Sequence, residues 1–235
     1  MASIPNLTTF RTGRRGHALR GGRSGRAGPH DDDDGDVRSV EAGRDAIIQQ
    51  TDHDASSSRM SAVALGYLDD RFAKAFLAPG EQITKRYPII HRGTYVRTTA
   101  IDKLVNRFLA AQPEHRKQVV SLGAGSDTRF FRLMADEQGG SPKYKVTYHE
   151  LDFEANANQK RSILRHSTEL SECLRRAEQD GSTYHLHAID LRDLTNKSPP
   201  IIPELDPALP TLLLSECCLC YLPPDAAASV LQYFT

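Results

Sequence analysis

Short apolar runs that end in glycine or polar residues alternate with helical periodicity over the second half of the chain. The runs are Gln118–Leu122 before Gly123, Tyr144–Leu151 before Asp152, Tyr184–Ile189 before Asp190, and Thr211–Leu214 before Ser215 and Glu216. Helical spacing of apolar residues follows over Thr128–Asp136, about Asn156–Gln179 and Pro224–Phe234. This alternation predicts an α/β fold with an open, parallel-dominated sheet flanked by helices. The wholly apolar run Thr211–Leu214 predicts a strand covered on both faces.

Two amphipathic helices are predicted before the first strand. Their apolar positions are Ala64, Tyr67, Leu68, Phe72, Ala75 and Phe76 in one, and Ile101, Leu104, Val105, Phe108 and Leu109 in the other. A loop that holds Pro79, Gly80 and Pro88 joins them. We therefore divide the chain into a tail (1–47), a helical segment (48–117) and an α/β core (118–235).

The tail is rich in arginine and glycine up to residue 30, and an acidic run that contains Asp31–Asp34 follows. Such a composition buries too little apolar area to offset chain entropy, so we expect residues 1–47 to be disordered. A transit peptide and an RNA-binding tail are alternative interpretations of the arginines. Its glycines argue against an amphipathic targeting helix.

Composition excludes several classes of protein. The 235 residues carry 30 basic and 30 acidic side chains, which gives no overall charge for binding nucleic acid or a membrane surface. No apolar run approaches the ~20 residues of a membrane span. Three of the four cysteines are Cys217, Cys218 and Cys220, too close together for a disulfide framework. Reduced, buried thiols of an intracellular protein fit better.

Gly123 and Gly125 form a Gly-x-Gly turn between the first predicted strand and a helix. The third glycine of a dinucleotide-binding fingerprint is absent, because Thr128 occupies its position. The distance in sequence to Asp152 also exceeds the ~20 residues of that fingerprint. By itself the motif is equally compatible with an ordinary tight turn.

Acidic residues at the ends of the next strands favour a nucleoside ligand. Asp152 is suited to a ribose diol, Asp190 to an adenine amino group with Leu191 beside the ring, and Glu216 to a positively charged amino group. Together they point to S-adenosylmethionine over NAD. Each acid alone is more often a helix cap or a surface residue. Zinc is the competing interpretation of Cys217, Cys218 and Cys220, but no second Cys/His pair lies at ligand spacing.

Six segments resemble the leucine carboxyl methyltransferases, in the order that this family has. They are Thr51–Phe76 (TDHDASSSRMSAVALGYLDDRFAKAF), Arg92–Arg97 (RGTYVR), Ser121–Leu133 (SLGAGSDTRFFRL), Tyr148–Phe153 (YHELDF), Ala188–Leu194 (AIDLRDL) and Leu213–Pro224 (LLSECCLCYLPP). The resemblance implies a Rossmann-like class I methyltransferase fold with N-terminal lid helices. It also implies methylation of the C-terminal leucine carboxylate of the type 2A protein phosphatase catalytic subunit, with S-adenosylmethionine as methyl donor.

The same resemblance assigns roles to residues of this chain. It makes Gly123, Asp152, Asp190, Leu191 and Glu216 cofactor contacts, with Arg97 and Arg59 as basic residues that bind the cofactor carboxylate. Tyr221 matches an aromatic position near the substrate leucine. A carboxylate is already deprotonated at neutral pH and the sulfonium methyl is electrophilic, so no general base is expected, and Arg97 and Tyr221 act by positioning.

Family members continue beyond the position of Thr235, so we expect the last strands to be missing and this chain to be truncated, unstable and inactive alone. A non-catalytic fragment that binds cofactor or phosphatase, and a small-molecule methyltransferase of the same fold, are the alternative functions. We further expect a cytoplasmic monomer that binds no metal, nucleic acid or membrane.

Overall fold

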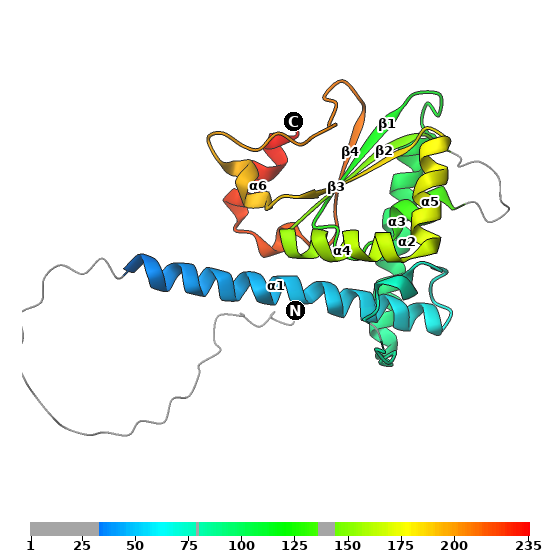
Figure 1. Ribbon diagram of the computed structural model, residues 1–235, viewed down its shortest axis with the longest axis horizontal. Coiled ribbons are helices and arrows are strands. Elements are labelled where there is room, and N and C mark those ends of the chain that lie inside the picture. The colour runs from blue at the N-terminus through cyan, green and yellow to red at the C-terminus, as the bar shows by residue number, and fades with distance from the viewer. Residues whose placement is uncertain (1–32, 79, 136–143) are drawn as a thin grey trace, which may run out of the picture. The chain divides into compact units, whose positions relative to one another are not determined.

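The computed structural model describes residues 33–78, 80–135 and 144–235 (Figure 1). The chain forms two compact units, 1–40 and 41–235, and the fold and site below belong to the second. The expected disorder of residues 1–32 and their two alternative roles lie outside the described residues. Residues 33–47 were also expected to be disordered, but helix α1 spans Asp33–Ala64. Arg44 donates to the Tyr221 carbonyl at 3.4 Å and Asp45 pairs with Arg192, and these tertiary contacts favour order in a stretch whose composition gives no sign of it.

Four parallel strands form the sheet, as predicted. They are β1 (Lys117–Leu122), β2 (Val146–Asp152), β3 (Thr183–Ala188) and β4 (Thr211–Ser215), in the order β3-β2-β1-β4. Ser121 of β1 lies opposite Glu150 of β2 and Leu214 of β4. Because all four strands run the same way, their carboxyl ends share one edge of the sheet, where ligands bind in open α/β sheets.

Helices cover both faces of this sheet (Figure 1). The helices are α2 (Pro88–Ala110), α3 (Arg129–Met134), α4 (Glu154–His166), α5 (Thr168–Gln179) and α6 (Pro224–Tyr233), with 3₁₀ turns η1 (Ala73–Phe76), η2 (Leu191–Thr195) and η3 (Leu219–Tyr221). Phe130 of α3 and Leu170 of α5 pack with Tyr148 on one face. Val230 of α6 packs with Val120 and Leu151 on the other. The alternating side chains of the central strands are thus buried on both faces, as parallel sheets require.

The helix predicted over about Asn156–Gln179 is two helices, α4 and α5. Ser167 separates them in an extended conformation, and its hydroxyl accepts a hydrogen bond from the Leu170 backbone N–H at 3.3 Å. A serine in this role satisfies one of the donors that a helix N-terminus leaves open. The periodicity continues across the break because α4 and α5 both bury apolar residues on the same core.

The prediction of a helix over Ala64–Phe76 is wrong. Helix α1 ends at Ala64, and Gly66 follows in a left-handed conformation with φ of 73°. Asp70 then accepts the Phe72 N–H at 3.1 Å and shapes a loop into the single turn η1. Phe72 is nevertheless buried, which explains the apolar pattern. The second predicted helix is α2, and it begins at Pro88, where the missing N–H costs no hydrogen bond.

The side chains of strand β4 are less buried than expected. Leu214 is buried, but Leu212 and Leu213 are only partly buried and Thr211 is exposed. The reason is its position, because β4 pairs only with β1 within the described sheet and is therefore an edge strand. No helix among the described residues is long and apolar enough to cross a membrane.

Candidate functional site

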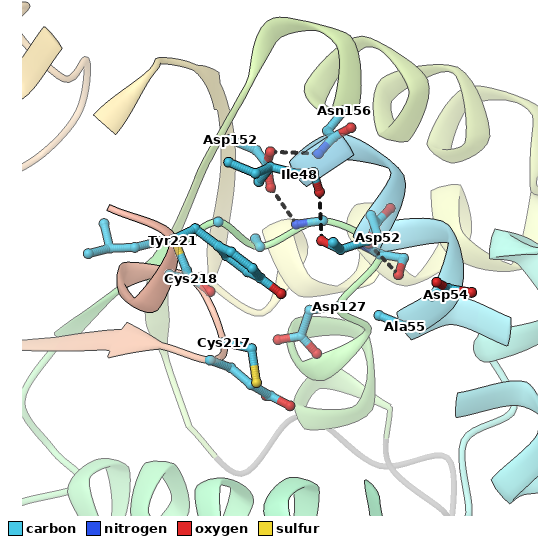
Figure 2. A pocket seen from close by; sticks show the side chains of 18 of the residues that line it. Ile48, Asp52, Asp54, Ala55, Asp127, Asp152, Asn156, Cys217, Cys218 and Tyr221 are labelled. Atoms are coloured by element: carbon cyan, nitrogen blue, oxygen red, sulfur yellow. Dashed lines mark hydrogen bonds between the residues drawn. The ribbon is translucent and has the colours of Figure 1, made fainter. Parts of the chain in front are cut away.

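A cavity of about 560 Å³ lies at the carboxyl edge of the sheet, within the size range of small-molecule sites. Residues 48–59 of α1 form one wall and residues 89–97 of α2 another, and the ends of the strands and the end of η3 at Tyr221 complete the lining. Figure 2 shows Asp52 of α1 and the Tyr221 ring directed into this space from separate elements. All eight residues that the sequence singled out line it: Arg59, Arg97, Gly123, Asp152, Asp190, Leu191, Glu216 and Tyr221.

The Gly-x-Gly turn is the floor of the cavity and requires its glycines. Gly123 has φ of 61° and Gly125 has φ of 45°, in the left-handed region that disfavours a side chain. A β-carbon on Gly123 would lie 2.5 Å from Cys218 Sγ. The backbone N–H and the hydroxyl of Ser126 both donate to Asp52 Oδ1, at 2.7 and 2.8 Å. The Gly-x-Gly turn is therefore hydrogen-bonded to α1 through Ser126 and Asp52.

Asp152 at the end of β2 is joined to the same turn. Its Oδ2 accepts the Gly125 N–H at 2.7 Å, and its Oδ1 accepts the Phe153 N–H at 2.7 Å and the Asn156 amide at 2.9 Å (Figure 2). Burial raises the pKa of Asp152, and these three donors oppose the rise. The carboxylate is thus held in one orientation at the cavity wall, and Oδ2 keeps one lone pair that can accept from a ligand hydroxyl.

Asp190 at the end of β3 has protein partners of its own. It caps η2 by accepting the Arg192 N–H at 2.9 Å, and the Arg192 guanidinium pairs with it. Arg192 Nη2 also pairs with Asp45 of α1 at 2.6 Å. The carboxylate expected to receive an adenine amino group is therefore shared with Arg192. Leu191 lines the cavity beside it and is otherwise part of the core.

Arg97 and Glu216 form an ion pair at the other end of the cavity, with Arg97 Nε 2.7 Å from Glu216 Oε1. Arg129 Nη2 lies 3.0 Å from the second oxygen, Glu216 Oε2. Burial lowers the pKa of Arg97, but the hydrogen bond and charge of Glu216 outweigh it, so the net shift is upward. The Arg97 side chain is 44% exposed, whereas that of Arg129 is 1% exposed.

Arg59 of α1 lies in the cavity wall but is paired within the protein. Its Nη1 is 3.3 Å from Asp70 Oδ2 and its Nη2 is 3.7 Å from Asp127 Oδ1. Burial alone would raise the pKa of Asp127, but Arg129, Arg59 and the neighbouring cations hold it at about 2. Of the two predicted carboxylate binders, Arg97 is therefore the more accessible.

The cysteines after β4 are not the buried thiols that the sequence suggested. Cys217 and Cys220 are exposed, and Cys218 is partly buried. Cys217 and Cys218 lie in the irregular turn that leads into η3, where Cys217 has φ of 52°, and Cys220 lies within η3. Burial and the charge of Asp152 raise the pKa of Cys218 to about 12, so this thiol stays protonated. In the described part of the chain, no three His, Cys, Asp or Glu side chains are arranged to hold a metal ion.

Sequence reasoning missed four charged residues of the site: Asp52, Asp102, Asp127 and Arg129. Arg129 is bonded to Asp102, Asp127 and Glu216, and its side chain is almost fully buried. Asp127 and Arg129 directly follow the Gly-x-Gly turn, which was the available local signal. Asp52 and Asp102 gave none, because their partners Ser126 and Arg129 lie far away in the sequence.

Comparison with known proteins assigns the chain to a family. The family model of leucine carboxyl methyltransferase matches residues 47–235. Leucine carboxyl methyltransferase 1 of Aspergillus fumigatus is 44% identical over 265 aligned positions, with 100% of this chain and 66% of that protein covered. The protein of the same name in Emericella nidulans is 42% identical, with 99% and 64% covered.

An Arabidopsis thaliana homologue is 34% identical, over 80% of this chain and 57% of its own length. The chain thus spans between 57% and 66% of the length of these three curated relatives. The family match begins in α1 and includes every cavity residue discussed above. The chain belongs to the leucine carboxyl methyltransferase family.

Proposed function

We propose that this chain carries the S-adenosylmethionine site of a protein carboxyl methyltransferase, and that the enzyme esterifies the C-terminal leucine of the type 2A protein phosphatase catalytic subunit. The names of the curated relatives support transfer of a methyl group to a leucine carboxyl group. We further expect that the phosphatase is the partner of the protein, and that the protein is a cytoplasmic monomer.

The observation that carries the proposal is the Arg97–Glu216 ion pair beside the Gly-x-Gly turn. The amino-acid part of S-adenosylmethionine is a zwitterion, with one carboxylate and one ammonium group. Arg97 would bind the carboxylate through charge-assisted hydrogen bonds, and Glu216 would accept from the ammonium group. A partly exposed cation, Arg97, and a more buried anion, Glu216, 2.7 Å apart thus fit the two ends of that group.

The remaining contacts fit the nucleoside. Asp152 is oriented by three donors and would bind the ribose hydroxyls. Gly123 lines the cavity and has no side chain, so its backbone can lie close to the ligand. Leu191 would contact the adenine ring, while Asp190 would reach the adenine amino group beside its ion pair with Arg192.

Bound S-adenosylmethionine supplies an electrophilic methyl group on a sulfonium centre. The residues of the chain then have to align an already ionised carboxylate with that methyl and to exclude water. Tyr221 is partly exposed at the cavity and is directed into it, so it would position the terminal leucine (Figure 2). No residue has to remove a proton, and we therefore assign no general base.

Transfer of labelled methyl from S-adenosylmethionine to the phosphatase catalytic subunit tests the proposal. With the complete enzyme whose cofactor site this chain carries, we expect labelling of the intact subunit and none after its last residue is deleted. Equal labelling of both forms would exclude specificity for the terminal leucine. Labelling of small carboxylic acids but not of the protein would support a small-molecule methyltransferase instead.

Binding of the cofactor product, S-adenosylhomocysteine, is measured by calorimetry in parallel. Binding without transfer would identify the chain as a non-catalytic binding fragment. Absence of binding would overturn the assignment of the cavity itself.

A further inference from the structure

We propose that Arg129 is a positioning residue, which holds in place both residues that clamp the amino-acid end of the cofactor. The proposal rests on the function proposed above. Arg129 itself lies behind the cavity and does not line it. Its guanidinium connects three carboxylates from three elements: Asp102 of α2, Asp127 of the loop before α3, and Glu216 after β4.

The first half of the argument concerns Glu216. One carboxylate oxygen faces Arg97 at 2.7 Å and the other faces Arg129 at 3.0 Å. A zwitterionic ligand competes for Arg97 and for the oxygen that Arg97 holds. Arg129 then remains as the partner that fixes Glu216, because it is bonded to the far oxygen and its side chain is only 1% exposed.

The second half concerns Arg97, which Arg129 positions through helix α2. Arg129 Nε donates to Asp102 Oδ1 at 2.7 Å, and Asp102 lies on α2 between one and two turns after Arg97. Arg132 also holds Asp102, with Nη1 2.5 Å from Oδ2 and Nη2 3.2 Å from Oδ1. The bond from Arg129 to Asp102 thus contributes, together with Arg132, to where α2 presents Arg97 to the cavity.

Charge balance explains why an arginine is required at position 129. Asp102, Asp127 and Glu216 would repel one another if a neutral residue lay between them. Burial alone would lower the pKa of Arg129, but the charges of these carboxylates raise it, so it remains a cation. A planar guanidinium can direct separate N–H groups at three acceptors, whereas a lysine ammonium keeps the charge but not this geometry.

The test compares two ligands on the full 235-residue chain. S-adenosylhomocysteine contains the charged amino-acid group, and 5′-methylthioadenosine has the nucleoside and thioether but lacks that group. We expect Arg129→Lys to weaken binding of S-adenosylhomocysteine about tenfold or more, as for a lost hydrogen bond to a charged group. Binding of 5′-methylthioadenosine should stay unchanged. Equal weakening of both ligands would show a merely structural role and overturn the proposal.

Arg132→Lys is the matched control, since Arg132 also pairs with Asp102 but has no contact with Glu216 in the described structure. We expect it to change S-adenosylhomocysteine binding much less than Arg129→Lys. In a chain that already carries Glu216→Gln, Arg129→Lys should weaken S-adenosylhomocysteine binding further only by the part that depends on α2. If Arg129→Lys weakens binding as much in this chain as in the wild type, Arg129 does not act through Glu216.

Asp102→Asn provides a second test that leaves Arg129 in place, and it decides the matter if Arg129→Lys does not fold. We expect selective loss of S-adenosylhomocysteine binding, and unchanged binding would overturn the role of α2. If the wild-type chain binds S-adenosylhomocysteine and neither Arg129→Lys nor Asp102→Asn weakens that binding, the positioning role alone is overturned. A wild-type chain that binds neither ligand overturns the proposed cofactor site, and the positioning role with it.

Discussion

The side chain of Asp52 occupies the space that a β-carbon on Gly125 would need: such an atom would lie 2.8 Å from Asp52 Cγ. Gly125→Ala should therefore displace Asp52 and break its two hydrogen bonds to Ser126. It should also strain the backbone, because Gly125 has φ of 45°. We expect a lower free energy of unfolding and weaker binding of S-adenosylhomocysteine, measured by urea titration and calorimetry.

Gly181→Ala separates the effect of backbone strain from the effect of displacing Asp52. Gly181 also has a positive φ, 86°, but the nearest atom to its built β-carbon is 3.6 Å away. This control should show the backbone strain alone, and Gly125→Ala should cost more. If Asp52→Ala does not reduce that excess, the contact between α1 and the turn is not its cause.

Asp152→Asn is expected to weaken S-adenosylhomocysteine binding by about 1–3 kcal/mol, or roughly 5- to 150-fold, the range for a buried hydrogen-bonding group that loses its partner. The amide leaves one acceptor oxygen where the carboxylate has two, and it faces the Gly125 or Phe153 N–H with a donor. Asp225→Asn, at an exposed position at the start of α6, is the control. Unchanged affinity in Asp152→Asn would refute the ribose assignment.

Lys160 and Glu150 form a buried ion pair, with Lys160 Nζ 2.6 Å from Glu150 Oε2 and the side chains 2% and 0% exposed. Lys160→Met should reduce the free energy of unfolding by about 3–5 kcal/mol, because it leaves a buried carboxylate without its cation. It also removes a bond of 2.8 Å to the Asp127 carbonyl, behind the Gly-x-Gly turn. Urea titration measures the loss.

The double variant Lys160→Met/Glu150→Gln tests the reason for that loss. Neutralising Glu150 should restore a large part of the stability, and Lys197→Met at an exposed position should have little effect. A double variant as unstable as Lys160→Met would assign the loss to packing and to the Asp127 bond.

His149, His185 and His187 stack on one face of β2 and β3, and His149 Nδ1 lies 3.0 Å from His187 Nε2. Burial, with its histidine neighbours, lowers the pKa of His149 to about 3, and burial lowers that of His187 to about 4. The native state therefore favours neutral rings, although Glu204 near His185 opposes the shift there. Below the ordinary pKa of 6.5 the unfolded chain binds these protons first.

Stability should therefore be complete above about pH 6.5 and fall toward pH 4, by up to ~1.4 kcal/mol per pH unit for each proton. Thermal unfolding at a series of pH values measures this slope. His149→Gln should make it shallower, whereas His115→Gln, on an exposed ring, should not. Parallel curves for all three proteins would exclude the stacked histidines as the cause.

Local patterns predicted the strands well, because a strand buried on both faces, such as Gln118–Leu122, is rich in apolar residues and is followed by a glycine or a polar residue. They also placed the Gly-x-Gly turn and the acids at the strand ends. The break at Ser167 was missed because periodicity on a shared core continues across it. The loop after Ala64 was missed because Phe72 is buried without being helical.

Local sequence patterns could not predict ion pairs between residues that lie far apart in the sequence. Nothing near Asp102 indicates that it faces Arg129, and nothing near Asp45 indicates Arg192. The orientation of Asp190 toward Arg192 depends on the turn η2, which sequence reasoning did not resolve. The family resemblance identified the cavity residues, but not the ionic contacts that hold them.

The ionic contacts in and around the cavity join residues that lie far apart in the sequence. Arg97 and Glu216 are separated by 119 positions, Arg129 and Glu216 by 87, and Asp45 and Arg192 by 147. Contacts between residues so far apart in the sequence raise the contact order, which is associated with slower folding. The cavity cannot exist on a growing chain before Glu216 has left the ribosome. Ligand affinity is consequently a more demanding measure of completed folding than the secondary structure content of the sheet.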